Sequence, residues 1–290
     1  MIRREAFAKL NLTLAVRGRR NDGFHELESW AVPIALADEL RFDPTDELRL
    51  SIESNAAVPL AGDSSNLVLR AARALADAVG RPPLVRIHLV KRIPIGGGLG
   101  GGSSDAAATL IALNELWRLN GSFDQLAAIA ATLGSDVPFF LSGGQAVMRG
   151  RGEILERVEG WRGFSAIVIP SFGVSTADVY RRHAQRAAMS TTRTTSNPSV
   201  LPWTVRGAGA DQLLPMLSND LESAAFEIEP RLAELHTRLS GEGGRIVRMT
   251  GSGSCLFTLF DDESAARAWS ARVRPALAAD DRVEVASVLG

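Results

Sequence analysis

The pattern of apolar and polar positions predicts short strands and helices along most of the chain. Residues 85–90 alternate apolar and mostly polar side chains, as a half-buried strand does. Residues 105–119 carry apolar side chains at helical spacing, so we expect a helix there. The segment between them is a loop rich in glycine. A strand, a glycine loop and a helix in this order are typical of a site that binds an anion such as phosphate.

The other predicted elements fall into two halves. The first half contains two strands and two capped helices, at residues 7–16 and 146–148 and at residues 66–79 and 122–134. The second half follows a β-α-β-β-α-β order, with elements at residues 165–170, 230–239, 246–249, 255–260, 263–277 and 283–289. That order is typical of a ferredoxin-like domain. We therefore expect an α+β chain with a boundary near Gly160, which gives domains at residues 1–160 and 161–290. Residues 187–210, rich in Ser, Thr, Pro and Gly, are predicted to form an exposed, mobile loop.

The glycine loop is the most informative segment of the chain. It does not end in Gly-Lys-Ser/Thr, so it is not a Walker A loop, and a match to Gly-x-Gly-x-x-Gly is weak within a glycine run. A flexible linker is the alternative, which the strong helix directly after the loop disfavours. We predict that the loop binds the phosphates of a nucleotide. The residues predicted to do so are Pro94, Ile95, Gly96, Gly97, Gly98, Leu99, Gly100, Gly101, Gly102, Ser103 and Ser104.

Composition excludes several classes of function. The 290 residues carry a formal net charge of −1, and the sequence pI is about 6.5, so nothing indicates a nucleic-acid partner or a membrane surface. Because Cys255 is the single cysteine, no intrachain disulfide can form, which suits a reducing compartment. The first residues make a poor signal peptide, and no apolar run is long enough to cross a bilayer. We therefore expect a cytoplasmic protein.

Lysine is rare in this chain. Of its 32 basic residues, all are arginine except Lys9 and Lys91. A lysine retained under such a bias is a candidate for a role that needs a compact point charge rather than a planar guanidinium. Chance survival is the alternative for both.

Several segments together resemble the GHMP kinases, the family of galactokinase, homoserine kinase and mevalonate kinase. The glycine loop resembles their phosphate loop. The further matching segments follow in the right order along nearly the whole chain, at residues 8–14, 19–27, 134–140 and 249–255. The resemblance implies a two-domain GHMP kinase fold with an N-terminal ATP-binding domain, a ferredoxin-like C-terminal domain on the substrate side, and the site in the cleft between them. It also implies ATP and Mg²⁺ as cofactors.

Lys9 and Asp136 look like the catalytic residues of this family. Asp136 would accept the proton of the attacking hydroxyl, and Lys9 would keep that carboxylate ionised and neutralise the transferring phosphoryl group. From the residue pattern alone, Asp136 is more typical of an N-cap for the next short helix, which Pro138 suits. A lysine in mid-strand usually points to solvent. The resemblance favours the catalytic roles.

The acceptor substrate is expected to bind near residues 22–25. In the family member that the glycine loop resembles most, an aromatic residue stacks on a cytosine and a histidine reads its edge. The resemblance gives these roles to Phe24 and His25, with phenylalanine where tyrosine is usual. The implied partner is a small molecule, cytidine diphosphate-linked methylerythritol, which would be phosphorylated on its 2-hydroxyl in the non-mevalonate route to isoprenoids.

Other residues are expected to complete the acceptor site. Asn11 projects from the same strand face as the catalytic lysine and is a candidate to hydrogen-bond the substrate. Tyr180 is a candidate second aromatic against the base, and the loop of Gly251, Ser252 and Gly253 would close on the substrate phosphates. The alternatives are a structural amide for Asn11, a core tyrosine for Tyr180 and a plain hairpin turn for the loop.

Two other functions compete with this interpretation. A kinase for homoserine or mevalonate is the nearest, and the segment at residues 22–25 argues against it. A catalytically silent ligand sensor on the same fold is the other, and the presence of both Lys9 and Asp136 argues against that. No metal-ligating set of side chains is predicted, and the chain is expected to be a monomer or a homodimer.

Overall fold

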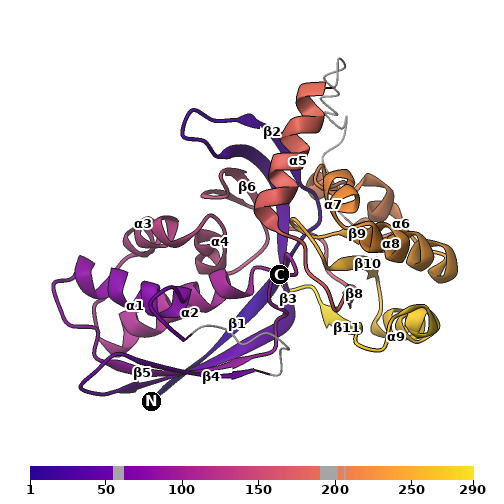
Figure 1. Ribbon diagram of the computed structural model, residues 1–290. Coiled ribbons are helices and arrows are strands. Elements are labelled where there is room, and N and C mark those ends of the chain that lie inside the picture. Colours follow the sequence, from indigo (N-terminus) through magenta and orange to yellow (C-terminus); the bar gives the residue numbers. More distant parts are fainter. Residues whose placement is uncertain (55–61, 190–201, 206) are drawn as a thin grey trace.

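The structure is a computed structural model that describes residues 1–54, 62–189, 202–205 and 207–290. Two β-sheets form its framework, and helices pack against each of them (Figure 1). The first sheet comes from the N-terminal half of the chain and lies mainly at the left of the view. The second comes from the C-terminal half, drawn in orange and yellow at the right. The predicted α+β class is confirmed.

Within the described residues, the first sheet has seven strands. They are β1 (Ile2–Asn11), β2 (Ala15–Arg19), β3 (His25–Pro44), β4 (Arg49–Ser54), β5 (Val85–Lys91), β6 (Ala146–Gly150) and β7 (Ile154–Arg157). Their order is β4-β5-β3-β6-β7, and β1 and β2 also pair with β3. The helices of this half are α1 (Leu67–Ala78), α2 (Gly101–Leu116), α3 (Phe123–Leu133) and α4 (Val137–Ser142).

β3 holds the first sheet together. Its 20 residues are long enough to pair with β1, β2, β5 and β6 at different points. The sequence predicted one strand over residues 7–16, which is wrong. β1 ends at Asn11 and β2 begins at Ala15, because Leu12 and Leu14 bond to Trp30 and to the second half of the chain instead of continuing the ladder.

Helix α2 follows the glycine loop directly. The sequence predicted a helix over residues 105–119, but α2 spans Gly101–Leu116, so two loop glycines belong to its first turn. The other predicted helices of this half are confirmed in α1 and α3. Ser122 and Gln125 form the predicted capping box at the start of α3.

The second sheet consists of β8 (Phe164–Ile169), β9 (Arg248–Met249), β10 (Leu256–Phe260) and β11 (Arg282–Ser287). Its order is β11-β8-β10-β9, and every neighbouring pair is antiparallel. This arrangement and the helices between the strands confirm the ferredoxin-like prediction. The helices are α5 (Thr176–Met189), η1 (Pro202–Thr204), α6 (Ala210–Leu213), η2 (Leu214–Met216), α7 (Glu222–Ile228), α8 (Pro230–Gly243), α9 (Glu263–Val273) and η3 (Arg274–Ala276).

The loop predicted over residues 187–210 is wrong at its two ends. α5 continues to Met189, and Pro202–Thr204 form a short 3-10 helix with Pro202 buried. Residues 190–201 and 206 of that prediction lie outside the described residues.

One buried cluster, the shared core, contains side chains from both sheets. It includes Leu10 and Trp30 from the first sheet and Ile167 and Phe257 from the second. The last residues of the chain extend the contact, because the Leu289 N–H donates a 2.8 Å hydrogen bond to Pro33 O. The two sheets therefore meet along a packed junction. The domain boundary near Gly160 stays a prediction.

Candidate active site

A cleft of about 200 Å³ lies where the two sheets meet. Segments distant in the sequence converge on it, because β1, the glycine loop, the start of α4, the start of α5 and the loop before β10 all contribute residues. The predicted site residues that line it are Lys9, Asn11, Gly96, Gly98, Gly100, Asp136, Tyr180, Gly251 and Ser252.

Lys9 is buried beside this cleft, with 4% of its side chain exposed. Its ammonium donates a hydrogen bond to Asn11 Oδ1 and lies 3.4 Å from Asp136 Oδ2. Its backbone N–H also donates to Leu99 O at 3.0 Å, which ties β1 to the glycine loop. A buried cation needs such oxygen partners to replace water. The solvent-facing alternative for Lys9 is therefore wrong.

The orientation of Asn11 is fixed by a chain of hydrogen bonds. Ser29 Oγ donates to Thr13 O at 2.6 Å and accepts from Asn11 Nδ2 at 2.7 Å. Since the amide nitrogen faces Ser29, the amide oxygen faces Lys9. The backbone N–H of Asn11 also donates to Thr250 Oγ1 at 2.9 Å. These hydrogen bonds fix Asn11, which in turn holds the Lys9 ammonium in place on the cleft wall.

Asp136 stands at the N-cap position of α4 without acting as a cap. Its backbone has helical angles, φ −87° and ψ −12°, and its side chain makes no capping hydrogen bond. N-cap residues usually have extended angles and accept such a bond. About a third of the side chain (34%) is exposed, and its Oδ2 faces Lys9. The carboxylate is thus open to a ligand in the cleft, and the capping alternative does not hold.

Two glycines of the loop need the conformation that glycine allows. At Gly98, φ is +76°, and a Cβ there would lie 2.3 Å from Thr250 O. At Gly100, φ is +71°, and a Cβ would lie 2.8 Å from the Phe140 ring. Gly100 precedes the first turn of α2 and offers no side-chain cap. The first amides of a 16-residue helix therefore begin beside the cleft, where they favour an anion.

Other residues predicted for phosphate binding lie away from the cleft wall. Leu99 is buried in the shared core, and Ile95 is about half exposed at 46%. Ser104 is buried in the first turn of α2 and lines a second cavity next to Phe139 and Phe140. The remaining predicted residues that do not line the cleft are Pro94, Gly97, Gly101, Gly102 and Ser103. The hydroxyl contacts expected of the two serines stay predictions without support from this geometry.

His25 begins β3 and packs on Tyr180 of α5, with ring centroids 5.0 Å apart. Its Nε2 is buried, and no residue that the structure describes hydrogen-bonds to it. Burial lowers the pKa of His25, so the ring is neutral at pH 7. Tyr180 lines the cleft, and burial raises the pKa of its phenol. A buried, unpartnered ring nitrogen is typical of a position completed by a ligand.

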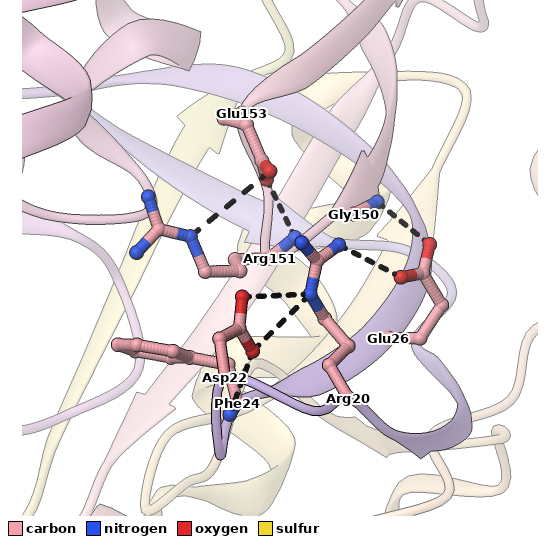
Figure 2. Close-up of polar contacts among 7 residues, drawn as sticks. All are labelled: Arg20, Asp22, Phe24, Glu26, Gly150, Arg151 and Glu153. Atoms are coloured by element: carbon pink, nitrogen blue, oxygen red, sulfur yellow. Dashed lines mark hydrogen bonds and ion pairs between the residues drawn. The ribbon is translucent and has the colours of Figure 1, made fainter.

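Phe24 lies at the tip of the hairpin that joins β2 to β3. Its side chain is 49% exposed, and the Arg151 guanidinium lies over its ring, 4.7 Å from the centroid (Figure 2). Neither Phe24 nor His25 contributes to the cleft wall itself. The stacking role of Phe24 stays a prediction.

The loop before β10 packs on the glycine loop. Gly251 approaches Gly98, since a Cβ on Gly251 would lie 2.9 Å from Gly98 O. Ser252 Oγ lies 2.7 Å from Thr176 Oγ1. Gly253 does not line the cleft. The loop thus braces the glycine loop and adds one hydroxyl pair to the cleft.

Comparison with known proteins decides the family. A profile of the GHMP kinases N terminal domain matches residues 66–144, and one of the GHMP kinases C terminal domain matches residues 207–276. Together these matches cover more than half of the chain. The chain belongs to the GHMP kinase family. Kinases of this family use ATP.

Individual relatives show which members of the family this chain is similar to. The chain is 41% identical over 264 residues to 4-diphosphocytidyl-2-C-methyl-D-erythritol kinase of Prosthecochloris aestuarii, covering 90% of both chains. It is also 41% identical over 270 residues to the enzyme of the same name from Pelotomaculum thermopropionicum, covering 93% of this chain and 92% of that one.

Solved structures agree with these relatives. A crystal structure of 4-(cytidine 5'-diphospho)-2C-methyl-D-erythritol kinase matches with a TM-score of 0.76 and 36% identity over 100% of both chains. The homoserine kinase from Cytophaga hutchinsonii has a TM-score of 0.74 at 18% identity over 99% of this chain and 94% of that one, which shows the shared GHMP kinase fold.

Sequence reasoning missed several lining residues of this GHMP kinase. They are Leu14, Leu27, Ser29, Met148, Arg151, Gly152 and Thr176. Most lie on β3, β6 or the turn after β6, and their place depends on strand pairing that local patterns do not reveal. Thr176 carried a weak signal, because it lies in the segment just before Tyr180.

The second retained lysine, Lys91, has a structural position. Its ammonium lies between Asp38 and Asp105, and the Asp105 Oδ2 contact is 2.8 Å. Burial raises the pKa of Asp105 to about 7, with Lys91 opposing that rise and Asp38 adding to it. A compact charge shared by two buried carboxylates fits lysine better than arginine.

No group of three or more His, Cys, Asp or Glu side chains that could hold a metal ion occurs among the described residues. Within the same residues, no helix is both long and apolar enough to span a membrane.

Proposed function

We propose that this GHMP kinase transfers the γ-phosphoryl group of ATP to the 2-hydroxyl of 4-diphosphocytidyl-2-C-methyl-D-erythritol, in the non-mevalonate route to isopentenyl diphosphate. The observation that carries the chemistry is the Lys9–Asp136 pair, 3.4 Å apart in a cleft flanked by a glycine loop. The relatives support the choice of acceptor, because those that are 41% and 36% identical over nearly the whole chain carry that substrate in their names, whereas the homoserine kinase is 18% identical.

The reaction follows from the roles of the two side chains. The acceptor hydroxyl would lie beside Asp136, which accepts its proton as the oxygen bonds to the γ-phosphorus and the bond from phosphorus to the ADP oxygen breaks. Lys9 would neutralise charge on the transferring group and on Asp136. Asn11 and Ser29 position the lysine. Phosphoryl transfer depends mostly on such positioning and charge neutralisation.

The nucleotide would lie along the glycine loop, with its phosphates against Gly96, Gly98 and Gly100. Mg²⁺ would be held chiefly by ATP, because Asp136 is the one carboxylate on the described cleft wall, and Mg²⁺ commonly binds through one carboxylate and substrate phosphates. When bound, Mg²⁺ supplies charge neutralisation at the phosphate oxygens. Cytoplasmic location and a monomeric or homodimeric state remain predictions.

A homoserine or mevalonate acceptor is the competing function, since kinases for both share this fold. The unpartnered Nε2 of His25 beside the cleft favours an acceptor that carries a base. Coupled ADP release with a panel of acceptors tests the proposal. We expect turnover with the cytidyl compound and little or none with its uridyl analogue, homoserine or mevalonate. Turnover of homoserine or mevalonate in preference to the cytidyl compound would refute the proposed acceptor.

A further inference from the structure

We infer that Arg151 is a substrate-binding residue of this chain, whose guanidinium binds the diphosphate that links the cytidine to the acceptor alcohol. This assignment rests on the proposed function. Arg151 follows β6, and its side chain reaches the cleft wall while 28% of it stays exposed. Lys9 and Arg151 are the positively charged side chains on the described cleft wall.

The two cations are in different situations. Lys9 already faces Asn11 and Asp136. Arg151 contacts the Glu153 carboxylate, because its Nε lies 4.0 Å from Oε1 and its backbone N–H donates to Oε2 at 2.5 Å. The Asp22 carboxylate also lies near enough to feel the Arg151 charge. Figure 2 shows that these contacts leave both terminal nitrogens of the guanidinium pointing away from Glu153. No hydrogen bond or ion pair to another described residue engages those two nitrogens.

The guanidinium is also held in place from one face. It lies over the Phe24 ring, 4.7 Å from the centroid, an arrangement that favours a planar cation. A guanidinium oriented at Nε and supported by an aromatic ring presents its two remaining NH₂ groups as a fork. That fork matches two oxygens of a phosphate group.

The hairpin that carries Phe24 is itself rigid. Arg20 Nε lies 3.1 Å from Asp22 Oδ2, and Asp22 Oδ1 accepts the Phe24 N–H at 3.1 Å (Figure 2). Arg20 also bonds to Glu26, whose other oxygen accepts the Gly150 N–H at 3.2 Å. The β2–β3 hairpin and the turn after β6 therefore form one braced unit around Arg151.

The position of this unit indicates which ligand Arg151 meets. Phe24 adjoins His25, and His25 packs on Tyr180, so these residues and Arg151 form one cluster of contacts. The glycine loop contacts Thr250, Gly251 and Cys255 instead. Arg151 thus belongs with the residues proposed to hold the base, where the neighbouring anion is the diphosphate of the acceptor rather than that of ATP.

Binding of two inert ligands tests the assignment without catalysis. Titration with cytidine 5'-diphosphate and with cytidine separates the contact to phosphate from the contact to base. We expect Arg151→Met to weaken cytidine 5'-diphosphate binding about tenfold to a hundredfold, which is the usual effect of losing a charge-assisted contact, and to change cytidine binding less than about twofold. Arg151→Lys should recover only part of the loss, because it restores the charge but not the fork.

Arg149→Met is the matched control. Arg149 lies two residues earlier, on β6, and pairs with Glu28 and Glu156, outside the cleft wall. Arg149→Met removes the same charge from a position outside the cleft, so its affinity for cytidine 5'-diphosphate should stay close to that of wild type. In turnover, Arg151→Met should raise KM for the acceptor and leave KM for ATP unchanged. Thermal melting of each variant checks that it folds.

Three results would overturn the assignment. Equal losses for cytidine and cytidine 5'-diphosphate would show that Arg151 only supports the hairpin. A raised KM for ATP with an unchanged KM for the acceptor would place its phosphate contact on the other substrate. If Arg151→Met bound cytidine 5'-diphosphate as tightly as Arg149→Met does, Arg151 would make no contact with the diphosphate. A wild-type protein that neither binds cytidine 5'-diphosphate nor phosphorylates the cytidyl acceptor would instead refute the proposed function, and this assignment with it.

Discussion

The ammonium of Lys9 lies 3.4 Å from the Oδ2 atom of Asp136, and β1 and the start of α4 bring the two side chains together. The local structure around each residue does not account for this pairing. Lys9 is buried in a strand that could have placed it in solvent, and Asp136 stands at an N-cap without capping. The pair therefore marks the place in the cleft where a proton and a phosphoryl group would change partners.

Asp136→Asn should leave the fold intact and lower kcat at least about a hundredfold, the low end of the contribution of a general base. The amide keeps the size of the carboxylate but cannot accept the proton. Steady-state turnover together with thermal melting measures both effects. Asp124→Asn, in the exposed first turn of α3, is the control. Near-normal turnover in a well-folded Asp136→Asn protein would contradict the role.

Lys9→Ala should lower kcat about a hundredfold or more while changing ATP affinity much less, because the charge acts on the transferring group. Lys9→Arg should not restore activity. The ammonium is buried and already contacts Asn11 and Asp136, so the larger, planar guanidinium should not take its place without displacing them. Full recovery with arginine would show that any positive charge suffices.

A glycine-loop substitution and a control outside the loop should separate the effect of backbone strain from the effect on nucleotide binding. Gly96 and Gly80 both have positive φ and open space around a Cβ, so alanine costs each about 1–2 kcal/mol of backbone strain. Gly96→Ala should also weaken nucleotide binding, while Gly80→Ala should not, and calorimetric titration with ATP distinguishes them. Equal ATP affinities in the two variants would remove the loop from the nucleotide site.

Gly98 differs from Gly96, because a Cβ there would meet the Thr250 carbonyl at 2.3 Å. Gly98→Val therefore cannot serve as a clean binding variant: overpacking adds about 1–3 kcal/mol of destabilisation to the strain.

His25→Ala should reduce discrimination between the cytidyl acceptor and its uridyl analogue, since the buried Nε2 has no protein partner and would read the edge of the base. We expect the ratio of kcat/KM values to fall about tenfold, with KM for ATP unchanged. His88→Ala, on the exposed side of β5, is the control. An unaltered ratio would mean that His25 does not contact the base.

The pH dependence of stability should reveal the raised pKa of Asp105. Its pKa rises from 3.8 to about 7 on folding, so the folded state binds the proton more tightly than the unfolded state. That contribution is complete below pH 3.8 and disappears as the pH rises through 7. Asp105→Asn should therefore gain stability relative to wild type between about pH 4 and 7, measured by urea unfolding. A stability difference between Asp105→Asn and wild type that does not change with pH would refute the raised pKa.

Local patterns could predict part of this fold and part of its site. Strand β5, helix α1 and the capped helix α3 follow from periodicity and capping residues. β3 could not be found in this way, because its 20 residues change partners along the strand and their burial does not alternate regularly. Ser29 and Arg151 could not be found for the same reason, since Ser29 lies on β3 and Arg151 follows β6, the strand that pairs with β3.

The predicted phosphate residues show where sequence reasoning reached too far. Ser103 and Ser104 follow the glycines and carry hydroxyls, which made them candidates. Because α2 begins at Gly101, Ser104 is a buried residue of its first turn and lines the second cavity instead of the cleft. The motif identified the loop, and the exact start of the helix decides which of its atoms reach the cleft.

The shared core limits how this enzyme can open. Because Leu10 and Trp30 pack with Ile167 and Phe257 in one buried cluster, swinging the two halves apart would expose large apolar surfaces to water. Opening and release of products must therefore come from local movements at the rim of the cleft. For the same reason, neither half expressed alone should behave as a well-folded, soluble protein. Turnover would depend on the mobility of a few rim residues rather than on a hinge.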